Sequence, residues 1–184
     1  MTKILVADDE RVVLFTLAEG LREAGFDVVE ARDGLQALAL CRSEKPDLAL
    51  LDIRMPGLDG LDLAQRLRDE TTVPFLFFSA YGDEAMVQRA VEIGALGYLI
   101  KPLQVASIVP MIRTALARSK DISGLQGALA SNRTIATAVG MLMRAEGLDQ
   151  PAAFDRLRGQ ARSQRRKLED VARLMIDGDT VLKS

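Results

Sequence analysis

Acidic side chains end two of the apolar segments in this sequence and point to metal or phosphoryl chemistry. Asp8 and Asp9 close the run KILVADD, and Asp52 lies in LALLDIRMP. In an open parallel sheet the carboxyl ends of the strands meet at one edge, so we expect the three carboxylates to share a pocket. Two unit charges about 4 Å apart repel each other by roughly 4 kcal/mol at an effective dielectric of about 20, so this cluster requires protons or a cation. The pattern predicts a site for a hard divalent cation.

Two further apolar segments end on groups that suit the same chemistry. The segment VPFLFFSA reaches Ser79, a hydroxyl, and ALGYLIKP reaches Lys101, an ammonium. A cation and an ammonium can both stabilise the charge that spreads over a transferring phosphoryl group. Carboxylates, hydroxyl, ammonium and metal together therefore predict phosphoryl transfer at one edge of a sheet.

The elements that must position these groups follow a repeated βα pattern through the first 120 residues. Apolar residues recur at helical spacing between short apolar runs, which is typical of a parallel sheet covered by helices. We expect strands near residues 3–8, 26–31, 47–52, 73–78 and 96–101. The fold class is therefore α/β, with a doubly wound five-stranded parallel sheet.

The remaining residues predict a small all-α unit of three helices on a long helical connector. Ser107 is the expected cap of the first helix, with Pro110 in its first turn, and Gly178 is the expected end of the last. Along the first helix, residues continue near heptad spacing at Ile122, Leu125, Leu129, Asn132, Ala136, Val139 and Met143. This spacing predicts pairing with a second copy, and the alternative is a helix that packs only on its own chain. The stretches PAAFDRLRGQARS and KLEDVARLMID form the two shorter helices.

Composition agrees with two domains, which we place at residues 1–118 and 119–184. Residues 1–121 hold 14 basic and 19 acidic side chains, a net charge of −5, whereas residues 122–184 hold 10 and 7, a net charge of +3. The chain has no histidine and one cysteine, Cys41, which argues against a zinc site and a disulfide framework. No apolar run reaches the length of a membrane span, so we expect a cytoplasmic protein without a membrane partner.

With these residues in place, residues 1 to about 118 resemble the receiver domain of two-component response regulators, a flavodoxin-like fold. The resemblance implies that Asp52 is the phosphoacceptor and that Mg²⁺ is bound by Asp8, Asp9, Asp52 and the backbone carbonyl of Arg54. It further implies a catalytic role for Lys101, switch roles for Ser79 and Tyr98, and a cis bond before Pro102. Because the chain lacks histidine, the phosphoryl donor must be another protein, a sensor histidine kinase.

The carboxyl third resembles the ANTAR domain, an RNA-binding antitermination module, through ALASNRTIATAVGMLM, AAFDRLRGQAR and KLEDVARLM. Arginine can bind phosphates and stack on splayed bases, so basic residues are the candidates for RNA contacts. The expected contacts are Arg133, Arg144, Arg158, Arg162, Arg165, Arg166 and Lys167.

Taken together, these features predict a phosphorylation-dependent response regulator that binds tandem hairpins in nascent mRNA as a homodimer and prevents transcription termination. The alternatives are a DNA-binding output and a protein-interaction output that uses exposed apolar residues such as Leu142 and Met143. We expect no separate enzymatic output, because the carboxyl third has no histidine, no cysteine and no paired-carboxylate site.

Overall fold

The structure is a computed structural model that describes residues 1–80, 82 and 84–182. The chain divides into two compact units, Met1–Lys120 and Asp121–Ser184. The first unit contains β1 (Lys3–Ala7), α1 (Arg11–Glu23), β2 (Asp27–Ala31), α2 (Gly34–Glu44), β3 (Leu48–Asp52), α3 (Gly60–Glu70), β4 (Phe75–Ser79), α4 (Glu84–Ile93), β5 (Tyr98–Ile100) and the beginning of α5 (Val105–Glu146). The expected alternation of strands and helices is therefore confirmed.

The five strands form one parallel sheet in the order β2-β1-β3-β4-β5. The order reverses direction beside β1, because β2 pairs on one side of β1 and β3 pairs on the other. At such a switch point the loops that leave neighbouring strands separate and open a crevice beyond the carboxyl ends of the strands. Asp8 follows β1 and Asp52 ends β3, so the crevice lies where the acidic residues were expected.

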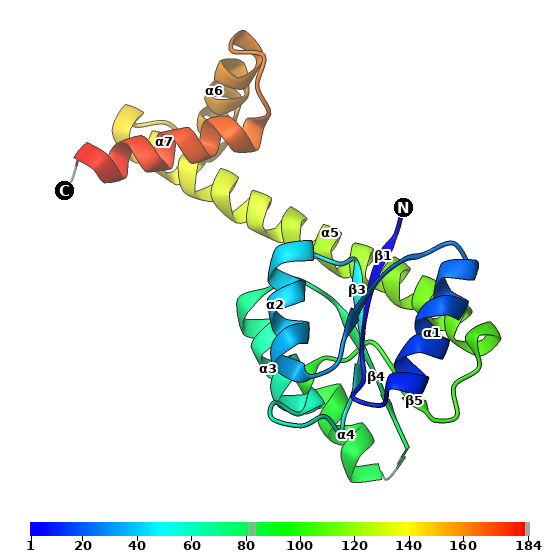
Figure 1. The fold of residues 1–184 in the computed structure, drawn as a ribbon. Helices are drawn as coiled ribbons and strands as arrows, with labels where there is room; N and C mark the ends of the chain where they lie inside the picture. The colour runs from blue at the N-terminus through cyan, green and yellow to red at the C-terminus, as the bar shows by residue number, and fades with distance from the viewer. Residues whose placement is uncertain (81, 83, 183–184) are drawn as a thin grey trace. The chain divides into compact units, whose positions relative to one another are not determined.

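Both faces of the sheet are buried, which explains why its strands are continuous apolar runs. Leu5, Leu51 and Phe77 point to the face that α2, α3 and α4 cover, whereas Leu50 and Phe78 point to the face that α1 and α5 cover. Figure 1 shows the two groups of helices on opposite sides of the strands. This burial holds the strand ends in a fixed register, because a slip of one residue would exchange the two faces.

Helix α3 lies unusually close to the strand that carries Asp52. Asp59 caps α3 by accepting a hydrogen bond from the backbone N–H of Asp62, at 2.8 Å. A Cβ atom at Gly60, the first helical residue, would lie only 2.1 Å from the backbone oxygen of Asp52. Glycine at this position therefore allows the helix to begin directly against the end of β3.

Helix α5 begins earlier than the sequence predicted. It starts at Val105, so Ser107 lies inside the helix rather than capping it, and Pro110 is the sixth helical residue. Val105 packs on α1 at Gly20, where an added Cβ would lie 2.4 Å from Val105 Cγ2. This packing extends the helix by a turn that the local sequence signals do not predict.

The second unit contains residues 121–146 of α5, together with α6 (Gln150–Ser163) and α7 (Leu168–Leu182). Asp149 caps α6 by accepting a hydrogen bond from the N–H of Ala152 at 2.9 Å. A separate apolar core holds the three helices together, and its buried members are Ala138, Val139, Leu142, Ala153, Leu157, Ala161, Val171 and Ala172. The predicted end of the last helix was wrong, since α7 continues past Gly178 to Leu182.

Candidate functional site

The three predicted carboxylates meet at the carboxyl edge of the sheet. Asp8, Asp9 and Asp52 each place a carboxylate oxygen within 4.8 Å of the others. Asp8 and Asp52 are buried, with 0% and 4% of their surface exposed, whereas Asp9 is exposed. The arrangement follows from the parallel pairing of β1 with β3, which brings the ends of these strands side by side.

The two carboxylate oxygens of Asp8 have different partners. Its Oδ1 accepts a hydrogen bond from the backbone N–H of Glu10 at 2.8 Å. Its Oδ2 is buried and accepts no hydrogen bond from a described residue, although Lys101 Nζ lies 2.9 Å away as an ion pair. This buried oxygen therefore already faces a cationic group, and as a hard oxygen ligand it could also bind a divalent cation.

Lys101 joins the carboxylates through its ammonium group. Its Nζ lies 2.9 Å from Asp8 Oδ2, 3.3 Å from Glu10 Oε1 and 3.5 Å from Asp52 Oδ2. The Nζ also lies 5.3 Å from the centre of the Phe78 ring. The backbone N–H of Lys101 donates a hydrogen bond to the backbone carbonyl oxygen of Ser79 at 2.8 Å. The bond between Lys101 and Pro102 is cis, as expected.

Burial and charge change the acidity of this cluster in opposite directions. The pKa of Asp52 is raised to about 6, because burial and the nearby Asp8 raise it by more than Lys101 lowers it. Burial also raises the pKa of Asp8 against the effect of Lys101. For Lys101, burial lowers the pKa, but Asp8, Asp52 and Glu10 outweigh it and raise the pKa overall. A divalent cation would relieve the repulsion among the ionised carboxylates.

The remaining predicted site residues of this unit occupy different places. Ser79 ends β4, is buried, and lies beside Phe78, which pairs with Asp52. Tyr98 begins β5 and pairs with Phe77, so its backbone lies two residues before the edge that carries Ser79. The Tyr98 side chain is half-buried against the core beneath α3 and α4.

Arg54 and Glu10 also lie beyond the carboxyl ends of β3 and β1. Arg54 follows β3 by two residues and has an exposed side chain, in a loop that the hydrogen bond from Gly60 N to Ile53 O closes at 2.9 Å. Glu10 was not predicted, although it extends the acidic pair to the sequence Asp8-Asp9-Glu10. That third consecutive acid was the available signal for its contact with Lys101.

The basic residues of the second unit fall into a paired and an unpaired group. Arg156 pairs with Glu146 at 3.4 Å, and Arg173 pairs with Glu169 at 2.9 Å. Within the described part of the chain no ion pair is found for the predicted RNA contacts, all of which are exposed: Arg133, Arg144, Arg158, Arg162, Arg165, Arg166 and Lys167. These seven side chains are therefore accessible to a nucleic-acid ligand.

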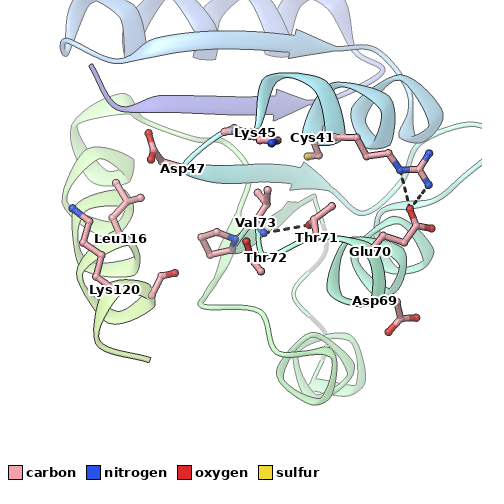
Figure 2. A pocket seen from close by; sticks show the side chains of 14 residues that line it. Cys41, Lys45, Asp47, Asp69, Glu70, Thr71, Thr72, Val73, Leu116 and Lys120 are labelled. Carbon is pink, nitrogen blue, oxygen red and sulfur yellow. Dashed lines mark hydrogen bonds and ion pairs between the residues drawn. The ribbon is translucent and has the colours of Figure 1, made fainter. Parts of the chain in front are cut away.

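A groove of about 850 Å³ lies at the opposite edge of the sheet, away from the carboxylates. Figure 2 shows Leu116 and Lys120 on one side of it and Asp69 and Glu70 on the other, with an ion pair between Arg42 and Glu70. Most of its charged lining is exposed to solvent. Cys41 lines it as a buried thiol, and burial raises the pKa of this thiol to about 12.

Two family models match the chain, one in each unit. The response regulator receiver domain matches residues 4–113, and the ANTAR domain matches residues 123–176. None of the helices in the described residues is both long and apolar enough to cross a membrane.

Curated relatives agree with these matches. The chain is 32% identical to the transcriptional regulatory protein PdtaR of Mycobacterium tuberculosis over 183 residues, which cover 95% of this chain and 89% of PdtaR. It is 41% identical to the transcriptional regulatory protein CseB of Streptomyces coelicolor over 123 residues, which cover 67% of this chain and 53% of CseB.

Solved structures resemble the first unit. The signal receiver domain of NarL from Mycobacterium tuberculosis is 34% identical with a TM-score of 0.58, and the match covers 65% of this chain and 96% of that domain. A two-component response regulator from Clostridium difficile is 29% identical with a TM-score of 0.61, covering 64% and 98%. The chain therefore belongs to the two-component response regulators and joins a receiver domain to an ANTAR domain, an RNA-binding rather than a catalytic output.

Proposed function

We propose that phosphorylation of Asp52 controls the binding of this protein to tandem hairpins in nascent mRNA, and that this binding prevents transcription termination. The domains are a receiver at residues 1–118 and an ANTAR output at residues 119–184, with α5 continuing across the boundary. The observation that carries the proposal is the ammonium of Lys101 within 3.5 Å of the buried Asp52 carboxylate, beside two further carboxylates.

The chemistry of this site follows from its side chains. An oxygen of Asp52 attacks the phosphorus atom of a phosphohistidine on a sensor kinase, an oxygen–phosphorus bond forms, and the nitrogen–phosphorus bond breaks. The pKa of about 6 leaves Asp52 ionised near neutral pH, as a nucleophile must be. Lys101 is already in place to stabilise negative charge on the transferring group.

Mg²⁺ is the proposed cofactor, because the cluster offers hard oxygen ligands and one buried carboxylate oxygen without a hydrogen bond. Its ligands would be Asp8, Asp9, Asp52 and the backbone carbonyl of Arg54. When bound, the ion supplies positive charge that stabilises the phosphoryl group during transfer.

A docking surface for the kinase borders the site. An apolar groove formed by Val12, Val13, Leu103 and Val105 reaches Lys101. Val12 is 78% exposed, so its side chain is accessible to a partner. A phosphorylated protein seated on this groove would place its donor group beside Asp52.

After phosphorylation, Ser79 and Tyr98 are the proposed switch residues. Ser79 ends the strand next to Asp52, and Tyr98 lies on the adjoining strand. A hydroxyl beside the phosphoryl group can bond to its oxygens, and a half-buried ring nearby can repack in response. Phosphorylation shifts the balance between inactive and active forms only by as much as it stabilises the active one.

Pairing of two chains would present two output domains to two hairpins. Heptad-spaced residues of α5 are exposed, including Ile122 at 45%, Leu125 at 66% and Leu129 at 68%. Asn132, in the same series, would fix the register of a parallel pair at some cost in stability. The homodimer is therefore the proposed RNA-binding form.

The alternative of a protein-interaction output is weakened by the burial of Leu142. Leu142, named as an exposed apolar contact, is only 5% exposed and lies in the core of the second unit. Met143 remains 36% exposed. Of the two residues named for this alternative, only Met143 is therefore accessible to a partner.

One binding experiment tests the function. The full chain is mixed with a pool of tandem-hairpin RNAs and with matched duplex DNA, with and without beryllofluoride and Mg²⁺ as a phosphoryl mimic. We expect beryllofluoride to increase RNA binding selectively, whereas preference for duplex DNA would indicate transcription control through DNA. In parallel, Asp52→Asn should prevent phosphate incorporation from a small phosphodonor, and retained labelling would refute the phosphoacceptor assignment.

A further inference from the structure

The turn between α6 and α7 places an arginine in a left-handed backbone conformation, which glycine adopts more readily than any other residue. Helix α6 ends with hydrogen bonds from Arg166 N to Ala161 O at 3.0 Å and from Arg165 N to Arg162 O at 3.1 Å. These two bonds define a Schellman motif, in which the residue at the position of Arg165 adopts the left-handed conformation. Arg165 has a φ of 52°, so it does adopt it.

Among the described residues the same motif also ends α1 and α4, each time with glycine at the left-handed position. Gly25 ends α1, with its N–H donating to Arg22 O at 2.9 Å, and has a φ of 92°. Gly94 ends α4, with its N–H donating to Val91 O at 2.9 Å, and has a φ of 93°. Side chains disfavour this conformation because Cβ approaches the following carbonyl. The local fold at Arg165 would therefore be more stable with glycine.

Arg165 lies in a cluster of positively charged side chains. Four cations lie within six residues at this turn, and we name Arg162, Arg165, Arg166 and Lys167 the basic turn. All four are exposed, and no ion pair with them is found among the described residues. The neighbouring Arg156 and Arg173 are instead neutralised by Glu146 and Glu169. The basic turn thus combines a concentration of positive charge with an unfavourable backbone geometry.

A polyanion bound at the turn would offset the cost of this geometry. Phosphate contacts from arginine and lysine supply most of the salt-dependent affinity of nucleic-acid complexes. The hydrogen bonds of the motif also fix the backbone at Arg165. Less conformational entropy is then lost when its side chain binds a ligand. Phe154 is only 37% exposed and lies in another part of α6, so base stacking at the turn would have to come from arginine.

We propose that the basic turn is the primary phosphate-binding surface of the output domain and that Arg165 is a principal RNA contact, held there at the expense of stability. This inference rests on the proposed RNA-binding function. Arg165 would then lower the stability of the second unit and raise its affinity for RNA, and different measurements can separate these two effects.

The test uses the full chain and the tandem-hairpin RNA pool. Arg165→Gly should raise the unfolding midpoint of the second unit by about 5 °C, since glycine relieves the backbone. The same variant should weaken RNA binding by about tenfold and reduce the slope of log affinity against log salt by about 0.7 to 0.9. Arg165→Asn, which also tolerates the left-handed conformation, should weaken binding equally, so added flexibility of glycine would not explain the loss.

A matched control comes from the first unit. Lys45 is the other described non-glycine residue with positive φ, at 47°, and it ends α2. Lys45→Gly should also stabilise its own unit but leave RNA affinity unchanged. Equal losses of affinity in the two variants would mean that the effect is global and would overturn the proposal.

A second pair of substitutions separates this inference from the proposed function. Arg158 and Arg162 lie four residues apart, on one face of α6, and Arg158 lies outside the basic turn. If Arg158→Ala weakens RNA binding while Arg165→Gly and Arg162→Ala do not, RNA binding stands and the basic turn is wrong. If the unsubstituted chain binds none of the RNA pool, with or without beryllofluoride, both the function and this inference fail.

Discussion

Replacing Asp52 with asparagine should stabilise the metal-free protein, and increasingly so as the pH rises. Burial raises the pKa of Asp52 from its ordinary value of 3.8 to about 6 in the folded state. A raised pKa in the folded state stabilises the fold below the unfolded pKa, and this contribution is lost as the pH rises through the folded pKa. The difference between the two pKa values corresponds to about 3 kcal/mol, which Asp52→Asn would recover because its amide remains neutral.

The size of the effect depends on the pH range that is sampled. About 2 kcal/mol of the difference falls between pH 4.5 and pH 8, where both proteins can be compared without acid unfolding. Asp8 is present in both proteins, so its own titration largely cancels when their unfolding free energies are subtracted. The 4% exposure of Asp52 means that solvent screening removes little of the effect.

The assay is urea unfolding of the full chain in the presence of a chelator, at closely spaced pH values from 4.5 to 8. Glu92→Gln is the matched control, because it makes the same carboxylate-to-amide change at an exposed residue of α4. We expect the unfolding free energy of Asp52→Asn to rise relative to that of the unsubstituted protein as the pH increases, and that of Glu92→Gln to run parallel to it. Parallel curves for Asp52→Asn as well would show that burial does not penalise the ionised carboxylate, and the reasoning would fail.

Three further predictions follow from other features of the structure. Mg²⁺ at about 100 times its Kd should raise the unfolding free energy of the unsubstituted protein by about 2.7 kcal/mol, and that of Asp52→Asn far less. Thermal melts of the two proteins measure this difference, and an equal rise of the melting temperature in both would show that the ion does not bind at Asp52. Gly60→Ala should destabilise the protein by about 1–3 kcal/mol, because its Cβ would lie 2.1 Å from the Asp52 backbone oxygen. Gly124→Ala, with no atom within 4 Å of its Cβ, should instead stabilise by up to ~1 kcal/mol in the same urea assay. Leu125→Glu with Leu129→Glu should give a monomer in sedimentation equilibrium at concentrations where the unsubstituted chain is dimeric, and a persisting dimer would exclude the heptad seam.

Much of the receiver fold and its acidic site could be predicted from the sequence. Apolar strands buried on both faces are recognisable without an alignment, and their parallel order brings their carboxyl ends together. Asp8, Asp52 and Lys101 were therefore expected to meet before any distance was known. The last strand is shorter than expected, since β5 spans only Tyr98–Ile100 where the sequence predicted a strand near residues 96–101.

Helix boundaries in α5 and α7 were harder to predict. Ser107 and Gly178 are good local signals for a helix start and a helix end, yet both lie inside helices. At the start of α5, the packing of Val105 against Gly20 contributes more than the local capping signal. Local propensity is a weak prior wherever tertiary packing favours a different boundary.

The sequence by itself determined which chemical groups stand at the strand ends, because the alternation of apolar runs and helical segments specifies a parallel sheet and its carboxyl edge. Only the tertiary structure decided which charges are neutralised. Glu10 approaches Lys101, and Glu146 neutralises Arg156, whereas the basic turn keeps its charge among the described residues. The physical reason is that an ion pair requires two side chains within a few ångströms of each other, and that separation depends on how helices and loops pack, which residue spacing alone does not specify.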